Sequence, residues 1–154
     1  MTRWSRGFRG GLALAALWLF GWGVGFGGLM EAFVDPHGEL VDIWPAALGF
    51  AGLLGGVILA VLLRISERGR GYEEVAPARF AVWGLITGLI LGALGVAIGL
   101  PNDIAIDTPV RKPIAPAALM GIMAALGLVA AIGSSIFFQL FARSPSRSVP
   151  AQER

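Results

Sequence analysis

The sequence predicts an all-α integral membrane protein with four transmembrane helices that pack through glycine. Hydrophobic residues make up 56% of the 154 residues and charged residues only 14%, which is too apolar for a soluble domain of this size. The uncharged residues form four runs of at least 21 residues, and a run of that length spans the roughly 30 Å hydrocarbon core of a bilayer. Most of the 23 glycines lie inside these runs, where small residues let helices approach closely.

The first run, residues 10–30, follows a basic segment that carries Arg3, Arg6 and Arg9. A basic start and an apolar run also fit a secretory signal, but this run is long for a signal and no A-x-A cleavage site follows it. We therefore expect a first transmembrane helix here. Residues 23–28 match G-x-G-x-x-G literally, but that motif needs a preceding strand to hold a pyrophosphate, so we interpret its glycines as packing residues.

An acidic loop, residues 31–42, connects the first run to the second. Its ionisable residues are Glu31, Asp35, His37, Glu39 and Asp42. Such side chains can bind a hard cation, but their spacing matches neither an EF-hand loop nor a zinc motif. We favour a solvated external loop with turns at Asp35-Pro36 and Gly38.

The second run, residues 43–63, carries Pro45 in its first turn, where the missing N–H costs nothing. One side of the predicted helix is lined by small residues, at Gly49, Gly52, Gly56 and Ala60. The following connection, Arg64–Arg79, contains four Arg and three Glu. It could dock a cytosolic partner, but we favour a solvated hairpin connection.

The third run, residues 80–100, places all its glycines on one narrow face of a helix that turns about 100° per residue. These residues are Gly84, Gly88, Gly92, Gly95 and Gly99. A glycine groove lets another backbone approach closely in lipid. Because a short connection makes the second and third helices antiparallel neighbours, we expect this face to pack on the small-residue stripe of the second helix, with Ala60 near Gly84.

The fourth run, residues 114–141, has 28 residues, and its length of about 42 Å requires tilt or projection from the bilayer. Its polar residues are Ser134, Ser135 and Gln139, which we expect to form hydrogen bonds between helices; lining a polar path is the alternative. We assign residues 1–141 to a single domain. Residues 142–154, rich in Ser, Pro and Arg, are expected to form a disordered cytoplasmic tail.

A shift of 71 residues superimposes parts of the two halves of the chain. Residues 45–48 and 116–119 both read Pro-Ala-Ala-Leu, and Gly56 then aligns with Gly127. Parallel repeats are one known way to build membrane bundles. The fold class therefore includes two parallel repeats of a helical hairpin as a possibility, with chance matching of common residues as the alternative.

The basic residues predict the orientation of the chain. The N-terminus, the 64–79 connection and the tail hold 10 of the 12 Lys and Arg residues, and the other side holds six of the ten acids. By the positive-inside rule both termini are cytoplasmic, in what we expect to be a bacterial inner or plasma membrane. This topology accounts for the basic character without nucleic acid as a partner.

Catalytic and cofactor chemistry is disfavoured by the residues present. The chain has no Cys, its one histidine is His37, and no Asp, Glu, Lys, Arg or His lies inside a run. It resembles small four-helix multidrug transporters in size and helix number, but they carry a glutamate inside the first helix, and here Glu31 lies at its end. Trp18 and Trp22, one turn apart, could stack on a flat hydrophobic ligand, although packing within the bundle is more usual.

We therefore expect a non-enzymatic protein, without cofactor or metal, that acts through helix–helix contacts. It would serve as an accessory or assembly subunit of another membrane protein, or as a self-associating scaffold, and its remaining partner would be the lipid bilayer. The alternative is a small channel or facilitator whose pore forms between protomers.

Overall fold

The computed structural model describes residues 3–34, 36–37, 44–67, 70–99 and 115–142. All regular structure in these residues is helical. Four helices are long and apolar enough to cross a membrane, namely Arg9–Val34, Trp44–Ser66, Pro77–Ala97 and Pro116–Phe141. The prediction of an all-helical chain with four such helices is thus confirmed.

The first helix is longer than the predicted 10–30 and is partly π-helical. It begins with α1 (Arg3–Phe20), widens into η1 (Gly21–Gly27), and ends with η2 (Met30–Val34). The N–H of Gly28 bonds to the carbonyl of Gly23, five residues earlier, which is the π-type hydrogen bond. Alternating glycines in this stretch have no Cβ to hinder the wider turn. Hydropathy does not indicate this change from α-helix to π-helix.

The second and third helices also differ from the predicted 43–63 and 80–100. α2 (Trp44–Ser66) continues past Arg64, and after the short 3₁₀ helix η3 (Tyr72–Glu74) the chain enters α3 (Pro77–Ala97). Proline suits the first turn of a helix because the backbone N–H that proline lacks would have no intrahelical acceptor there. Gly99 has a φ of 85°, the left-handed conformation with which glycine ends a helix, so its predicted place on the packing face of the third helix is wrong.

The fourth helix, α5 (Pro116–Ala142), has 27 residues, close to the predicted 114–141. Residues 100–114, which connect the third and fourth helices, lie outside the described part of the chain, as do residues 143–154 of the expected tail.

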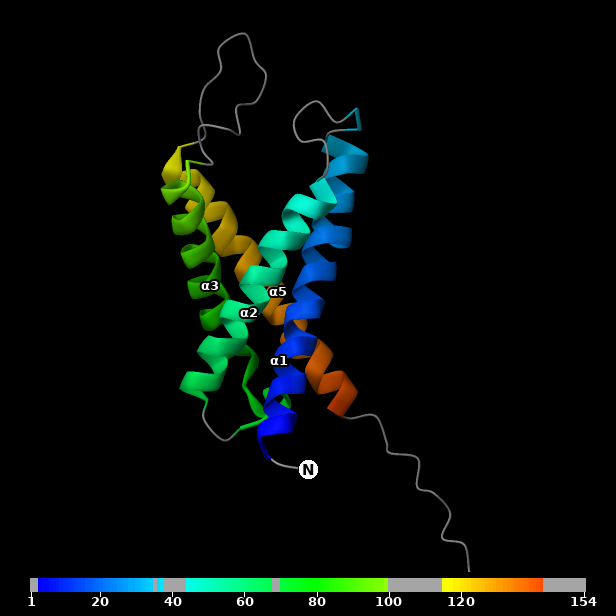
Figure 1. Cartoon of the computed structure of the whole chain (residues 1–154), viewed down its shortest axis with the longest axis vertical. Helices are drawn as coiled ribbons and strands as arrows, with labels where there is room; N and C mark the ends of the chain where they lie inside the picture. The colour runs from blue at the N-terminus through cyan, green and yellow to red at the C-terminus, as the bar shows by residue number, and fades with distance from the viewer. Residues whose placement is uncertain (1–2, 35, 38–43, 68–69, 100–114, 143–154) are drawn as a thin grey trace, which may run out of the picture.

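The helices form two antiparallel hairpins that cross near the middle of the molecule (Figure 1). α1 and η1 pack along α2, and α3 packs along α5, whereas contacts between α2 and α3 are much sparser. The start of α1, the connection from α2 to α3 and the end of α5 lie at one end (Figure 1). The hairpins diverge toward the opposite end.

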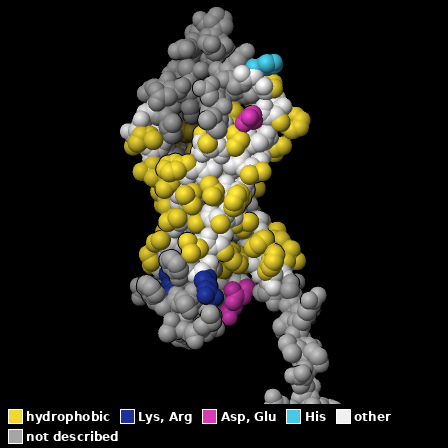
Figure 2. Space-filling view, turned by 45° about the vertical axis from the view of Figure 1, so that its right-hand side comes forward, with side chains coloured by type: hydrophobic (Ala, Val, Ile, Leu, Met, Phe, Trp, Pro, Cys, Tyr) yellow, Lys and Arg dark blue, Asp and Glu magenta, His cyan; other side chains and the backbone are white. Residues whose placement is uncertain are grey.

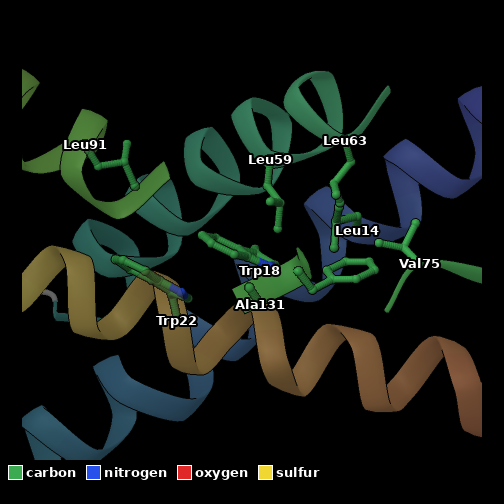
Figure 3. Packing of buried hydrophobic residues seen from close by; sticks show 9 residues of the cluster. Leu14, Trp18, Trp22, Leu59, Leu63, Val75, Leu91 and Ala131 are labelled. Carbon is green, nitrogen blue, oxygen red and sulfur yellow. The ribbon is translucent and has the colours of Figure 1, made fainter. Parts of the chain in front are cut away.

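The core lies where the hairpins cross, and Figure 3 shows its packing. Its buried residues come from every helix and from the α2–α3 connection: Leu14, Trp18, Trp22, Leu59, Leu63, Val75, Phe80, Leu91 and Ala131. Large apolar side chains also cover the outside of the spans, with charged ones gathered toward the two ends (Figure 2). This distribution is the one expected of helices surrounded by lipid.

Candidate helix-docking surface

The predicted stripe on α2 packs against α1. A Cβ added to Gly52 would lie 2.7 Å from Cβ of Trp22, and one added to Gly56 would lie 2.7 Å from Cα of Ala15. Gly49 faces Leu19 and Gly23 in the same way. Ala60 is close to Gly11, whose added Cβ would be 3.7 Å from that of Ala60. These glycines therefore bring α2 against the backbone of the first helix.

The glycine face of α3 packs on α5, so the predicted pairing of this face with α2 is wrong. A Cβ added to Gly88 would lie 2.7 Å from Cα of Ala124, and one added to Gly92 would lie 2.8 Å from Cα of Met120. Gly84 faces Ala131 and the backbone of Gly127. Small residues of α5 provide the matching surface. Ala60 lies near Gly11 and Gly84 lies near Ala131, so the predicted proximity of Ala60 and Gly84 is wrong.

Further packing residues lie outside the two predicted stripes on α2 and α3. Gly23 and Gly27 oppose the backbone around Pro45, Gly55 lies against the indole of Trp18, and Gly127 opposes Gly84 and Gly88. Gly95 of the predicted set is buried in α3. Of the glycines at 23–28 that the sequence was interpreted to use for packing, Gly23 and Gly27 meet the neighbouring helix, whereas Gly25 and Gly28 do not.

Three glycines on the first helix face outward. Gly21, Gly25 and Gly28 have no heavy atom within 4 Å of an added Cβ, and Gly21 and Gly25 are exposed. Their spacing of four and three residues places them on one side of the helix. We call these three residues the outward glycine face. It lies along the π-helical stretch, and π-bulges occur frequently at functional sites.

The outward glycine face has apolar borders. Phe20, Val24 and Leu29 are all more than half exposed, and Ala32 is exposed one turn beyond Gly28. Glycine forms helix poorly, at a cost of about 1 kcal/mol relative to alanine in water. Close packing of these positions against another described helix does not offset that cost here, because an added Cβ would have no such neighbour within 4 Å.

The two tryptophans lie inside the bundle and stack on each other. Their ring centroids are 5.8 Å apart with planes inclined by 16°, and both side chains are at most 1% exposed. Nε1 of Trp18 donates to Oγ of Ser134 at 3.0 Å, which links the first hairpin to the second. Nε1 of Trp22 has no hydrogen-bond partner among the described residues. Trp18 therefore acts as a buried bridge between hairpins.

The polar residues of the spans bond mainly within their own helices. Ser134 donates to the carbonyl of Ala130 at 2.8 Å, Thr87 donates to that of Trp83 at 2.8 Å, and Gln139 donates to Oγ of Ser135 at 3.4 Å. The bond between Trp18 and Ser134 is the predicted kind of interhelical contact.

Most of the candidate cation site in the acidic loop falls outside the described residues. Asp35, Glu39 and Asp42 are not described, while Glu31 and His37 lie exposed at the end of the first helix. Among the residues described, His, Asp and Glu do not gather into a group of three that could hold a metal ion.

The connection between α2 and α3 is folded against the end of the bundle. Tyr72 contacts Phe138 of α5 with ring centroids 5.4 Å apart and Phe80 of α3 at 6.4 Å. Burial of its ring raises the pKa of the Tyr72 hydroxyl, with Arg64 acting weakly in the opposite direction. Tyr72 thus closes this end of the bundle, while Arg64, Glu73 and Glu74 of the connection remain exposed.

The surface of the described residues is suited to packing, because its spans offer apolar side chains and open glycine backbone, and the charged side chains seen in Figure 2 lie toward the ends. Comparisons of the chain with protein-family models, curated proteins and solved structures find no match. Its function must therefore be inferred from its own geometry.

Proposed function

We propose that this chain is a non-enzymatic protein of four membrane spans that acts as a scaffold by self-association. The outward glycine face of the first helix is the docking surface, and its occupant is the same face of a second copy. Both copies lie in the bilayer with their termini on the cytoplasmic side.

The carrying observation is the division of glycines into two sets. Those of α2 and α3 lie against a neighbouring backbone, as Gly56 does against Ala15 and Gly88 against Ala124, whereas Gly21 and Gly25 meet open space. In lipid, helices associate by dispersion and close backbone approach, and glycine permits that approach. An outward set therefore supports a partner helix that is not part of the fold.

A second copy is the partner that this surface favours. A flat glycine face is complementary to itself, and closed two-fold dimers are the commonest soluble homo-oligomers. The chain already contains such a contact, because Gly127 of α5 meets the backbone of Gly84 and Gly88 of α3. No charged side chain borders Gly21 and Gly25 in the sequence, so two copies can approach without repulsion.

Energy transfer between labelled copies in liposomes tests self-association. The chain has no Cys, so Ala78→Cys at an exposed position accepts donor and acceptor dyes. Gly25→Leu is expected to weaken association by about tenfold or more, since bulk inserted at a close contact typically costs 1–3 kcal/mol. Gly133→Leu on α5 is the matched control, because an added Cβ there also meets open space.

The outcomes separate the proposal from its competitors. Equal weakening by Gly25→Leu and Gly133→Leu, or an unassociated parent protein, would contradict self-association through this face. A different protein that copurifies and is lost with Gly25→Leu would assign the face to an accessory subunit. Ion or solute flux through liposomes that depends on protein concentration would favour the channel.

The orientation rests on the distribution of basic residues. A membrane-impermeant thiol reagent should label His37→Cys in intact cells and leave Ala78→Cys unlabelled. These positions are exposed at opposite ends of the molecule. The reverse labelling pattern would invert the topology.

We also infer that the two hairpins are parallel repeats of one ancestral hairpin. The 71-residue shift aligns Gly56 with Gly127, and each of these glycines opposes the backbone of the first helix of its own hairpin. This geometric equivalence supports the repeat independently of the shared Pro-Ala-Ala-Leu. It predicts that substitutions at Gly56 and Gly127 disrupt equivalent contacts in the two hairpins.

A further inference from the structure

A polar hollow lies at the end of α2, outside the proposed docking surface. It has a volume of about 300 Å³ and is lined by Ser66, Glu67, Arg70 and Arg79. Two arginines and one glutamate give the lining a formal charge of +1. The hollow therefore combines space, hydrogen-bond donors and a net positive charge.

Glu67 holds the two arginines in place. Its side chain is only 5% exposed; Oε1 accepts from Nη1 of Arg79 at 2.6 Å, and Oε2 accepts from Nη1 of Arg70 at 3.1 Å. Hydrogen bonding from Arg79 is the main reason that the pKa of Glu67 lies below its ordinary value, and Arg70 adds to the effect. The carboxylate is therefore ionised near neutral pH and fixes both guanidinium groups.

Most N–H donors of Arg70 and Arg79 are not used in the bonds to Glu67. Side chains of Arg70 and Arg79 are 56% and 57% exposed, and the bonds to Glu67 use one N–H of each. A guanidinium carries five N–H donors in a planar fork that matches phosphate oxygens. Two such groups held on one carboxylate form a preorganised donor set.

The position of the hollow suits a ligand at a membrane surface. α2 ends at Ser66, directly before the hollow, and Ile65 beside it is 59% exposed. Charged side chains gather at this end just beyond the apolar band (Figure 2). A phosphate of a lipid headgroup lies at this boundary, and a free phosphate can reach it from water.

We propose that the hollow formed by Ser66, Glu67, Arg70 and Arg79 is a binding site for a phosphate group. Arg70 and Arg79 donate to its oxygens, and Glu67 keeps the two guanidinium groups apart and oriented. The proposal is independent of self-association, since it concerns the opposite end of the first hairpin from the outward glycine face.

Two probes distinguish the source of the phosphate. Delipidated protein is placed in nanodiscs of phosphatidylcholine with or without phosphatidylglycerol, and retained lipid is counted by native mass spectrometry. In parallel, inorganic phosphate is titrated into the protein in a neutral detergent by calorimetry. Arg70→Gln is the test variant, because it removes one guanidinium and leaves the pair between Arg79 and Glu67 intact. Arg64→Gln, an exposed arginine that does not line the hollow, is the matched control.

Arg70→Gln is expected to weaken binding about tenfold, the effect of losing a charge-assisted hydrogen bond, with partial recovery in Arg70→Lys. Arg64→Gln should leave binding within about twofold of the parent. Selective retention of phosphatidylglycerol that depends on Arg70 would identify a lipid site. Binding of inorganic phosphate that depends on Arg70, without lipid preference, would identify a free-anion site. Equal losses in the Arg70 and Arg64 variants, or binding of neither probe, would overturn the proposal.

Discussion

The two hairpins use glycine differently. In the first, glycines of α2 contact the backbone of α1 and also receive aromatic side chains, as Gly55 does against the indole of Trp18. In the second, Gly88 lies against the backbone at Met123 and Ala124, and Gly127 faces Gly84. The first interface therefore combines close backbone contact with aromatic side chains, while the glycines of the second meet mainly backbone atoms of the neighbouring helix.

This difference suggests an interpretation of how the helices pair. The stacked indoles of Trp18 in α1 and Trp22 in η1 lie against the glycines of α2. With α2 occupied, the face of α3 pairs with the small residues of α5. We interpret the large side chains as favouring one pair of helices, and the glycines as setting how closely the helices approach.

The largest expected effect is at Trp18, in the hairpin formed by α1 and α2. Trp18→Ala should lower the free energy of unfolding by about 3–5 kcal/mol, the usual cost of removing a large buried aromatic group. The substitution removes the indole that packs against Gly55 and the hydrogen bond to Ser134. Unfolding in bicelles measures this loss of stability. Leu12→Ala, on the same helix but 55% exposed, should cost far less; similar costs would mean that Trp18 is not packed inside.

The hairpin formed by α3 and α5 should lose stability when a larger side chain is introduced at its interface. Gly88→Leu is expected to cost about 1–3 kcal/mol by overpacking, since the new side chain would meet the backbone of α5. Gly121→Leu, at a position on α5 with open space around it, should change the stability little. Reversed sensitivities in the same unfolding assay would show that α3 and α5 do not pack through Gly88.

A smaller effect is expected at the bond between the hairpins. A double-mutant cycle of Trp18→Phe and Ser134→Ala should give a coupling energy of about 0.6 kcal/mol, the average for hydrogen bonds between membrane helices. Trp18→Phe keeps most of the ring while removing Nε1, which donates to Ser134. A coupling energy of zero would mean that the hairpins are held together by packing alone.

The smallest expected effect concerns pH and the connection between the hairpins. Because the folded-state pKa of Glu67 is below its ordinary value of 4.5, its ionised form stabilises the fold above that value. The stabilisation is lost as pH falls through the folded pKa. As pH falls below 4.5, the free energy of unfolding should therefore decline less steeply in Glu67→Gln than in the parent. Exposed Glu73, changed to Gln, controls for loss of one charge; an unchanged slope in Glu67→Gln would contradict the ion-pair assignment.

Hydropathy and charge predicted the number and approximate position of the helices, because long uncharged runs have few alternatives to a membrane span. They did not predict the π-helical stretch after Phe20, since a wider turn leaves composition unchanged. The end of α3 at Ala97 was also missed, although Gly99 before Pro101 is a recognisable stop signal.

Candidate packing residues are easier to recognise in the sequence than the helices that they contact. The stripes at Gly52 and Gly88 are visible as helical periodicity, but the same pattern fits any neighbour that can come close. Sequence proximity favoured α2 with α3, whereas the glycines of α2 lie against Trp18 and its neighbours, a contact that is visible only in three dimensions. The pairing of Glu67 with Arg79 was missed because the two residues are 12 positions apart in a connection whose path the sequence does not reveal.

Disulfide crosslinking at Ala60 tests the pairing of the helices most directly. The chain has no Cys, and a Cβ added to Gly11 would lie 3.7 Å from Cβ of Ala60, within the usual 3.5–4.5 Å of a disulfide. Gly11→Cys with Ala60→Cys should crosslink rapidly in membranes, and Ala60→Cys with Gly84→Cys should not. A crosslink in the second pair and none in the first would show that α2 packs on α3, and the division into two glycine-packed hairpins would be wrong.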